Sequence, residues 1–347
     1  MEVSVPEISQ ALSIQGPSGN GFYMDERWLD LIQSIYGFNV TRLEARGSDG
    51  ALRGYLPVCA LSSPLTGRRI VSLPFSDICP LVATDNATAH QLVDQAVALR
   101  KKHRARYIEL RTGSSALLEG RDDFIAADNY VSWRVELAAG ESSVWSGVEK
   151  PVQRQVKKSR KMGVTVRFAR QREDMDIYHR LHVGTRSGKH GMPAQPRAFF
   201  RGLWDRFGAD GTLQVLFAEH EGQTIAGMVL FASGDTVRYA YGASEEQALH
   251  LAPNNLLMWE SITWAINNSY HIFDMGRTAR DNHGLMEYKR KWGATAEPLP
   301  YYYSPQVAGL ASTSETSRKY QVLTACWKRL PLPVASTLGG ILYKHLG

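Results

Sequence analysis

Val237–Ala296 reads VRYAYGASEEQALHLAPNNLLMWESITWAINNSYHIFDMGRTARDNHGLMEYKRKWGATA, and this stretch decides the fold. Its first residues alternate aromatic and small side chains, which predicts a strand, and the apolar run that begins at Pro253 predicts a helix packed on a sheet. A second strand at His271–Asp274 and a short basic helix around Lys289 follow. Strand, helix and strand in this order indicate an α/β fold with mixed sheets.

Three features of this stretch suit an acyl-transfer site. Tyr239 and Tyr241 alternate with small residues, so we expect both rings on one face of their strand. Asp274 ends the second strand, at the edge where open α/β sheets bind ligands, and is a candidate for the proton path. Lys289 follows an aromatic residue and precedes Trp292, where an ammonium group can stabilise the negative charge of a transition state. The alternatives are core tyrosines and solvated cations at a helix C-terminus.

Basic residues are concentrated on a second predicted helix, Pro151–Met162. Four of them share one face of that helix: Arg154, Lys157, Lys158 and Lys161. Such a row can bind phosphate groups through charge-assisted contacts, so we predict a polyanion-binding face, and the alternative is a solvated helix surface. After the next predicted helix, a glycine-containing loop presents Arg186, which we predict to bind substrate.

The first half of the chain has a comparable order of predicted elements. These are a helix within Phe22–Phe38, a hairpin of Asn39–Ala45 with Ala51–Ala60, a strand at Arg69–Pro74, a helix at Ala87–His103 and a strand at Tyr107–Arg111. Periodicity is lost around residues 138–146, where we place a domain boundary. We therefore predict a first domain of residues 1–142, a second of residues 143–304, and a helical tail of residues 305–347 that packs on them. The similar order in both halves indicates a duplicated domain.

Composition narrows the class of protein. At 347 residues, with 44% hydrophobic and 21% charged residues, the chain suits two ordinary globular domains. Its net charge of +6 suits a polyanionic partner such as tRNA, coenzyme A or an anionic membrane face, and the alternative is a merely basic surface. Cys59, Cys79 and Cys326 have no CxxC spacing, which disfavours a disulfide framework or a zinc cluster and favours a reducing compartment.

Several common signals are missing from the sequence. It has no signal-peptide pattern and no apolar run of roughly 18 to 20 residues, so we expect a cytoplasmic protein. It also lacks GxSxG, a P-loop, HExxH and a GxGxxG that follows a strand. This disfavours covalent-intermediate hydrolases and metalloenzymes, and we predict no metal site and no tightly bound cofactor.

Four motifs in one order, YAYGAS, PNNLLMWESITWA, FDMGR and GLMEYKRKWGA, resemble the C-terminal domain of FemAB-type aminoacyltransferases. They also resemble the related GNAT-like acyltransferases known as BioF-like acetyltransferase domains. The segments LPFSDICPLVA at Leu73–Ala83 and RKMGVTVRFA look like earlier parts of the same two-domain family. The resemblance implies two tandem GNAT-like domains, with donor and acceptor meeting in the second domain and between the two.

FemAB proteins transfer an amino acid from aminoacyl-tRNA to an amine of a peptidoglycan precursor, and the resemblance implies a bacterial N-acyl or aminoacyl transferase. It also implies that Lys289 and Tyr288 steer the terminal nucleotides of the donor, that Lys289 stabilises the transition state, and that Tyr239, Tyr241 and Arg186 hold the acceptor. The predicted catalytic residues are Lys289, Asp274 and Tyr241, and the predicted substrate-binding residues are Arg186, Tyr239, Tyr288, Arg277 and Asn255.

Two departures from the family leave the acyl donor open. The long helical hairpin of some members has no counterpart, and HLAPNN at His250–Asn255 replaces the RxxGxG/A pyrophosphate loop of ordinary GNAT enzymes. The donor is therefore an aminoacyl-tRNA or an acyl-CoA, and the acceptor is an amine of a peptidoglycan or exopolysaccharide precursor. The alternatives are an acyl-CoA-dependent GNAT N-acyltransferase and a non-catalytic family member that binds an envelope precursor.

The C-terminal tail combines basic and apolar residues. Arg318, Lys319, Lys328 and Arg329 lie near Trp327 in the sequence. This pattern suits peripheral contact with the inner face of the membrane as an alternative to packing on the parent domain, which we predict for the tail.

Overall fold

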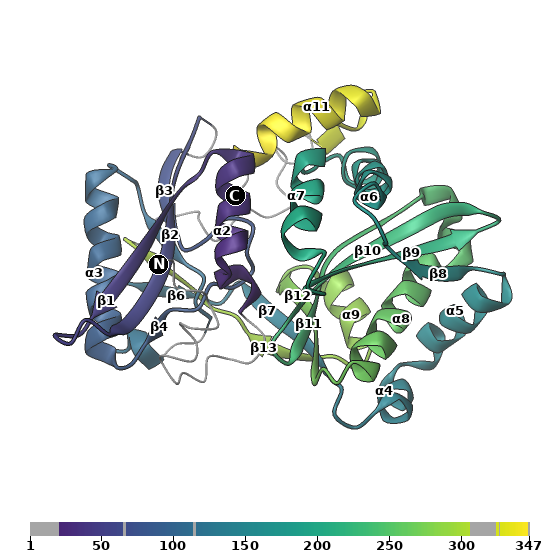
Figure 1. The fold of residues 1–347 in the computed structure, drawn as a ribbon, viewed down its shortest axis with the longest axis horizontal. Helices are drawn as coiled ribbons and strands as arrows, with labels where there is room; N and C mark the ends of the chain where they lie inside the picture. The colour runs from purple at the N-terminus through teal and green to yellow at the C-terminus, as the bar shows by residue number, and fades with distance from the viewer. Residues whose placement is uncertain (1–20, 65–66, 114–115, 306–323, 326, 346–347) are drawn as a thin grey trace. The chain divides into compact units, whose positions relative to one another are not determined.

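The computed structural model describes residues 21–64, 67–113, 116–305, 324–325 and 327–345 (Figure 1). The chain forms two compact units, the first comprising Met1–Ser132, Glu297–Thr313 and Gly347, and the second Trp133–Ala296 and Ser314–Leu346. The first boundary therefore lies earlier than the predicted limit at residue 142. Glu297–Thr313 belongs to the first unit because the strand Tyr301–Ser304 within it pairs in the first sheet. The predicted limits of the two tandem domains stay a prediction.

The first unit is built on a mixed sheet of seven strands. Its helical elements are η1 (Phe22–Met24), α2 (Glu26–Tyr36), α3 (Asn86–Lys102) and η2 (Ala116–Leu118), and its strands are β1 (Asn39–Arg46), β2 (Leu52–Ser63), β3 (Gly67–Val71), β4 (Val82–Ala83), β5 (Ile108–Leu110), β6 (Ile125–Ala127) and β14 (Tyr301–Ser304). The strand order is β1-β2-β3-β5-β14-β6, with β4 paired to β2. β3 and β5 run parallel, and α3 buries its apolar face against the sheet to form the core.

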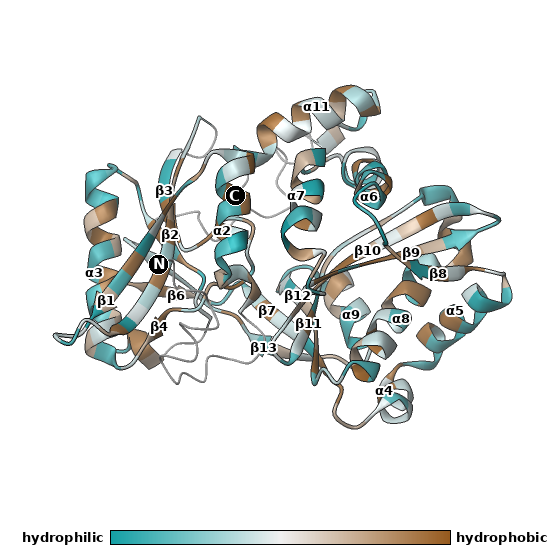
Figure 2. Ribbon diagram, viewed as in Figure 1, coloured by the Kyte–Doolittle hydropathy of each residue, from teal (hydrophilic) through white to brown (hydrophobic). Residues whose placement is uncertain are grey.

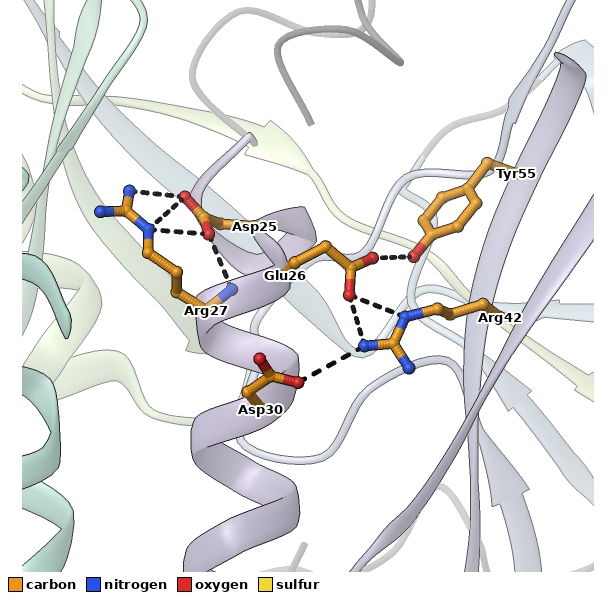
Figure 3. Close-up of polar contacts among 6 residues, drawn as sticks. All are labelled: Asp25, Glu26, Arg27, Asp30, Arg42 and Tyr55. Carbon is orange, nitrogen blue, oxygen red and sulfur yellow. Dashed lines mark hydrogen bonds and ion pairs between the residues drawn. The ribbon is translucent and has the colours of Figure 1, made fainter. Parts of the chain in front are cut away.

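Polar contacts fix α2 against the β1–β2 hairpin (Figure 3). Asp25 caps the helix, since its carboxylate accepts a hydrogen bond from the backbone N–H of Arg27 at 2.8 Å. Glu26, in the first turn, accepts hydrogen bonds from the Tyr55 hydroxyl on β2 at 2.9 Å and from Arg42 Nε on β1 at 2.7 Å. One carboxylate therefore holds both strands of the hairpin to the start of the helix.

The second unit repeats the plan with more helices around its sheet. Its helical elements are α4 (Glu141–Gly147), α5 (Lys150–Lys161), α6 (Asp174–Val183), the π-helical turn η3 (Gly184–Lys189), α7 (Arg197–Phe207), η4 (Glu246–Leu251), α8 (Pro253–Asn267), α9 (His283–Arg290), α11 (Leu332–Leu342) and η5 (Tyr343–His345). Its sheet has the order β13-β7-β12-β11-β10-β9-β8. These strands are β7 (Tyr130–Glu136), β8 (Thr165–Phe168), β9 (Leu213–His220), β10 (Gln223–Ser233), β11 (Thr236–Ser244), β12 (Ile272–Ala279) and β13 (Thr295–Pro298).

Helices cover both faces of this second sheet. Tyr178 of α6 lies over Gly227 of β10, where an added Cβ would come within 2.9 Å of the tyrosine ring. Ser261 of α8 contacts the next residue, Met228, with its hydroxyl oxygen 3.2 Å from the sulfur. Because neighbouring residues of a strand face opposite sides, α6 and α8 pack on opposite faces. The α/β fold with mixed sheets that the sequence predicts is confirmed.

β11 carries a bulge that the sequence pattern does not predict. Tyr239 pairs with Leu230, and Tyr241 pairs with the preceding residue, Val229, so Ala240 is the extra residue on β11. Since Leu230 and Val229 face opposite sides of β10, the two tyrosines also lie on opposite faces of the sheet. The prediction that both rings share one face is therefore wrong, because the bulge interrupts the alternation on which it rests.

The C-terminal helix α11 packs in the second unit against α6 and η3 (yellow in Figure 1). Of the tail residues that suit membrane contact, Lys328 and Arg329 are exposed. Arg318 and Lys319 lie outside the described residues.

Candidate active site

The candidate site begins where β11 and β12 part. The two strands are parallel neighbours, but within the described residues they pair only over Thr236–Arg238 and Ile272–Asp274. β11 continues to Ser244 and β12 to Ala279, so their later backbone groups are not joined by a shared ladder. A divergence of this kind offers backbone donors and acceptors to an extended ligand, because those groups need partners.

A buried ion pair fixes the point of divergence. Arg238 Nη2 lies 2.5 Å from Asp274 Oδ2, and the two side chains are only 5% and 9% exposed. Asp274 Oδ1 also accepts a hydrogen bond from the backbone N–H of Gly276 at 2.7 Å. Gly276 has a φ of 75°, a conformation that glycine adopts without steric cost. Both carboxylate oxygens of Asp274 therefore already have partners, Arg238 on β11 and the backbone of Gly276 on β12. A role of Asp274 in a proton path stays a prediction.

Lys289 is the basic group at this divergence. Asn282 caps α9 by accepting a hydrogen bond from Leu285 N at 3.1 Å. Lys289, in the last turn of that helix, is only 3% exposed. Its Nζ donates to the carbonyl oxygens of Gly276 at 2.9 Å and Arg277 at 3.1 Å, directly after the paired part of β12. The ammonium group is therefore held against β12 just beyond the part of that strand that pairs with β11.

Two tyrosines lie close to one another in this region. Burial raises the pKa of the Tyr239 phenol, and the Tyr288 phenol adds to the increase. Burial also raises the pKa of Tyr288, to about 12, so both hydroxyls are neutral hydrogen-bond donors at physiological pH. The Tyr239 hydroxyl occupies the space beside Gly242, where an added Cβ would lie 2.2 Å from the oxygen. Gly242 therefore provides the room that the Tyr239 ring requires.

Tyr241 lies on the opposite face of the sheet, in an aromatic cluster. Its ring centroid is 5.9–6.2 Å from those of Phe199, Phe200, Phe231 and His182, all in edge-to-face geometry. The structure therefore separates Tyr241 from Tyr239, and it places Tyr241 beside α6 and α7.

The same cluster contains a buried histidine that the sequence reasoning missed. His182 is 3% exposed and contacts Gln195 Oε1 through Nε2 at 2.5 Å. Burial, assisted by the positive charge of Arg186, lowers the pKa of His182 to about 3, so the ring is neutral. Its Nδ1 has no hydrogen-bond partner in the described part of the chain. The spacing of Tyr178 and His182, one helical turn apart, is the signal that was available in the sequence.

Arg186 lies on the π-helical turn η3, which is attached to the end of β11. Thr185 Oγ1 accepts a hydrogen bond from Ser244 N at 3.0 Å and donates one to Ser244 O at 3.1 Å. The Arg186 Nε is buried and has no hydrogen-bond partner among the described residues. π-helical turns are frequent at functional sites, so this position suits the predicted role in substrate binding.

Tyr343 of η5 senses the charge of two predicted substrate-binding residues. Burial raises the pKa of Tyr343, and the positive charges of Arg186 on η3 and Arg277 on β12 oppose that increase. The sequence reasoning did not select Tyr343.

The other predicted residues lie further along the unit. Asn255 is half-buried in the first turn of α8, and its neighbour Asn254 donates to Ser244 Oγ at the end of β11 at 3.2 Å. The row of Arg154, Lys157, Lys158 and Lys161 is exposed on α5, whose inner side chains Val152 and Val156 are buried. The row therefore has the exposure that a polyanion-binding face requires.

The described residues contain no group of three or more His, Cys, Asp or Glu side chains arranged to hold a metal ion. None of their helices is long and apolar enough to cross a membrane.

Comparisons with known proteins relate this geometry to an enzyme family. Residues 147–290 match the family of the acetyltransferase (GNAT) domain. The matched segment runs through α5 to α9 and includes the divergence of β11 and β12, Lys289 and Arg186. The candidate site therefore lies inside the matched segment.

Known structures resemble the whole described fold. FemX superposes with a TM-score of 0.68 and 15% sequence identity, covering 91% of this chain and 99% of that one. A tandem GNAT protein from the clavulanic acid biosynthesis pathway gives a TM-score of 0.51 at 11% identity, covering 87% of this chain and 94% of that one. At these identities the likeness shows the fold, and it confirms the predicted tandem GNAT-like architecture.

A local sequence match points in the same direction. The lipid II:glycine glycyltransferase of Staphylococcus epidermidis is 30% identical over 82 residues, which is 22% of this chain and 20% of that protein. The match thus spans about one fifth of the length of that relative. Together with the GNAT match and the FemX fold, it confirms the resemblance to FemAB-type proteins drawn from the sequence.

Proposed function

We propose that the protein is an N-acyltransferase that moves an aminoacyl or similar activated acyl group onto an amine of a cell-envelope precursor. The observation that carries the proposal is the divergence of β11 and β12 inside the GNAT-matched segment, with the Lys289 ammonium bound to β12 at that point. The match to a lipid II:glycine glycyltransferase and the FemX-like fold support an aminoacyl donor and a cell-wall acceptor.

The proposed reaction is a direct displacement at the acyl carbon. A neutral amine attacks the carbonyl and forms the new carbon–nitrogen bond, the bond to the carrier oxygen or sulfur breaks, and the amine proton passes to the leaving group through water or a base. Backbone groups of the diverging strands align the donor. Lys289 stabilises the negative charge that develops on the carbonyl oxygen, assisted by the Tyr239 and Tyr288 hydroxyls.

A donor carried by coenzyme A is the second candidate, favoured by the match to an acetyltransferase domain. The start of α8 argues for the first candidate. A helix N-terminus binds pyrophosphate through free backbone N–H groups. Here Pro253 has no N–H and the N–H of Asn255 donates to the carbonyl of Ala252, so the first turn offers fewer N–H groups than an ordinary helix N-terminus. We therefore infer that the donor carrier is tRNA, and that the exposed row on α5 contacts its phosphates.

The decisive experiment compares donors by mass spectrometry. The purified protein and an amine from a peptidoglycan precursor are incubated with charged tRNA, acetyl-CoA or longer acyl-CoAs. We expect a mass increase from charged tRNA, which is lost in Lys289→Ala and kept in Lys291→Ala. Lys291 is the matched control because it follows the same helix but is half-exposed and pairs with Glu287 at 3.4 Å. Transfer from a CoA thioester alone would replace the proposed donor, and full activity of Lys289→Ala would remove Lys289 from the mechanism.

We infer that the protein works as a peripheral protein at the inner membrane face, where a lipid-linked cell-envelope acceptor would be held.

A further inference from the structure

α11 is oriented with its small residues inward and its large apolar residues outward. Ala335 is fully buried, and a Cβ added at Gly339 would come within 3.0 Å of the backbone nitrogen of Ala194. A Cβ at Gly340 would come within 3.2 Å of Pro196. The helix therefore lies so close to residues 194–196 that only small residues fit on its inner side. An ordinary surface helix buries its large apolar residues instead.

The outward side of α11 forms an exposed apolar face. Its members are Val334, Leu338 and Ile341, which are 44%, 39% and 58% exposed. These three residues follow the spacing of one helix face, whereas Leu332, in the first turn, lies on the other side of the helix near Gly188. Elsewhere among the described residues, large hydrophobic side chains this exposed occur only singly, at Ile125, Met162 and Leu285. Apolar colouring of α11 is visible in Figure 2.

Positive charge borders this apolar face at both ends. Lys328 and Arg329 precede α11, Lys344 follows it, and all three are exposed. The sequence has no Asp or Glu after Glu315. A helix face with large apolar residues and basic residues at its borders is the pattern that lies in the headgroup region of an anionic bilayer.

We propose that the α11 face docks on the surface of a bilayer that contains anionic lipids. The apolar side chains enter the boundary between headgroups and acyl chains, while the basic residues contact the lipid headgroups. A second protein fits less well, because a stable protein interface uses about 20–30 residues a side and this face offers three large apolar side chains. The proposal does not depend on the transferase function, since lipid binding is measured without turnover.

Docking through α11 would also couple the membrane to the candidate site. The helix packs against η3, which carries Arg186, and continues directly into η5. A lipid-linked acceptor would be presented at the surface on which α11 is anchored.

The experiment is co-sedimentation of the full-length protein with lipid vesicles. Vesicles of phosphatidylcholine alone are compared with vesicles that also contain phosphatidylglycerol, at low and high salt. The variants are Leu338→Gln with Ile341→Gln on the apolar face, Lys328→Glu with Arg329→Glu at its border, and Ile125→Gln as a control. Ile125 is a suitable control because it is 41% exposed and lies in the other unit. Melting curves verify that each variant is folded.

We expect the wild type to sediment with the anionic vesicles and to be released by salt. The apolar pair should lower the partition coefficient by about tenfold or more, because membrane affinity scales with the apolar area inserted. The charge reversal should lower it by roughly fivefold or more per residue on anionic vesicles. Ile125→Gln should sediment like the wild type. The proposal is overturned if the wild type remains in the supernatant, or if the apolar pair binds as well as the wild type. It is also overturned if that pair instead abolishes a dimer seen by sedimentation velocity.

Discussion

The two units contain the same motif, a parallel strand pair joined by a helix, and they differ at its open end. In the first unit, hydrogen bonds continue past the β3–β5 pair: Ser72 N donates to Glu109 O, and Arg111 N donates to Ser72 Oγ, each at 2.9 Å. In the second unit the ladder of β11 and β12 ends at the Arg238–Asp274 pair, although both strands continue.

In the first unit, one side chain, Arg111, binds the backbone carbonyls of the segment that follows β3. The Arg111 guanidinium donates to the carbonyls of Leu73 at 3.1 Å and Ser76 at 3.0 Å, and it pairs with Glu109 at 2.7 Å. Lys289 in the second unit comes from the helix after the pair and bonds to carbonyls of β12. Both units therefore use a buried cation to bind backbone carbonyls beside the parallel pair, and they differ in whether hydrogen bonds continue between the two chain segments beyond that pair.

Breaking the ion pair at the divergence should have the largest effect. Asp274→Asn removes the negative charge that pairs with the buried Arg238, and breaking a buried ion pair costs about 3–5 kcal/mol in the free energy of unfolding. Urea unfolding measures this change. Asp30→Asn is the control, because that carboxylate is 62% exposed beside Arg42 and should matter far less. Similar losses in both variants would show that the pair does not lock the divergence.

The next prediction compares the basic residue proposed for catalysis in the second unit, Lys289, with the basic residue that binds backbone carbonyls in the first unit, Arg111. Lys289→Ala should lower kcat by about 10²–10³-fold, the usual cost of losing one preorganised oxyanion donor. Arg111→Ala should lower the melting temperature and leave kcat of the folded protein unchanged, because Arg111 bonds within the first unit. Kinetic assays below the melting temperature of each variant test both statements. Loss of kcat in Arg111→Ala alone would assign the chemistry to the first unit.

A smaller effect concerns pH and the buried His182. Its folded pKa of about 3 lies below its ordinary value of 6.5, so the unfolded chain takes up the proton first as pH falls. Its contribution to stability is therefore complete above pH 6.5 and is lost as pH falls from there toward 3, by about 1.4 kcal/mol per pH unit.

Urea unfolding between about pH 7 and pH 5 should show this slope in the wild type. His182→Gln should lower the slope of the free energy of unfolding against pH by the contribution of one proton, about 1.4 kcal/mol per pH unit. A smaller slope should remain in that variant, since burial also lowers the pKa of His179. An unchanged slope in His182→Gln would mean that the ring is not held neutral in the folded state.

The smallest effect on stability is expected on α5. Lys157→Glu with Lys161→Glu should change the free energy of unfolding by no more than about 0.5 kcal/mol, because both side chains are exposed. The pair should weaken filter retention of bulk tRNA and reduce its salt dependence by about one unit of slope per lysine removed. Lys101→Glu with Lys102→Glu on α3, also exposed, is the matched control. Equal weakening in both pairs would indicate general charge rather than a tRNA-binding face.

Much of the fold could be predicted from local pattern. The predicted hairpin of Asn39–Ala45 and Ala51–Ala60 corresponds to β1 and β2, and the predicted helix Ala87–His103 corresponds to α3, each within a few residues. β7 and β14 were missed, because the partners that make them strands are distant in the sequence: β14 pairs with β5 and β6. Strand pairing over such separations leaves little local signal.

The sequence by itself determined the α/β class, the duplicated order of elements, the FemAB-type resemblance and the choice of Lys289, because periodicity, turn residues and motif order are local properties. Only the tertiary structure decided that Tyr239 and Tyr241 face opposite sides, that Asp274 is paired with Arg238, and that α11 presents its large residues outward. The reason is physical. A bulge is fixed by register with another strand, an ion pair by what is buried beside it, and a helix face by how closely its other side is packed.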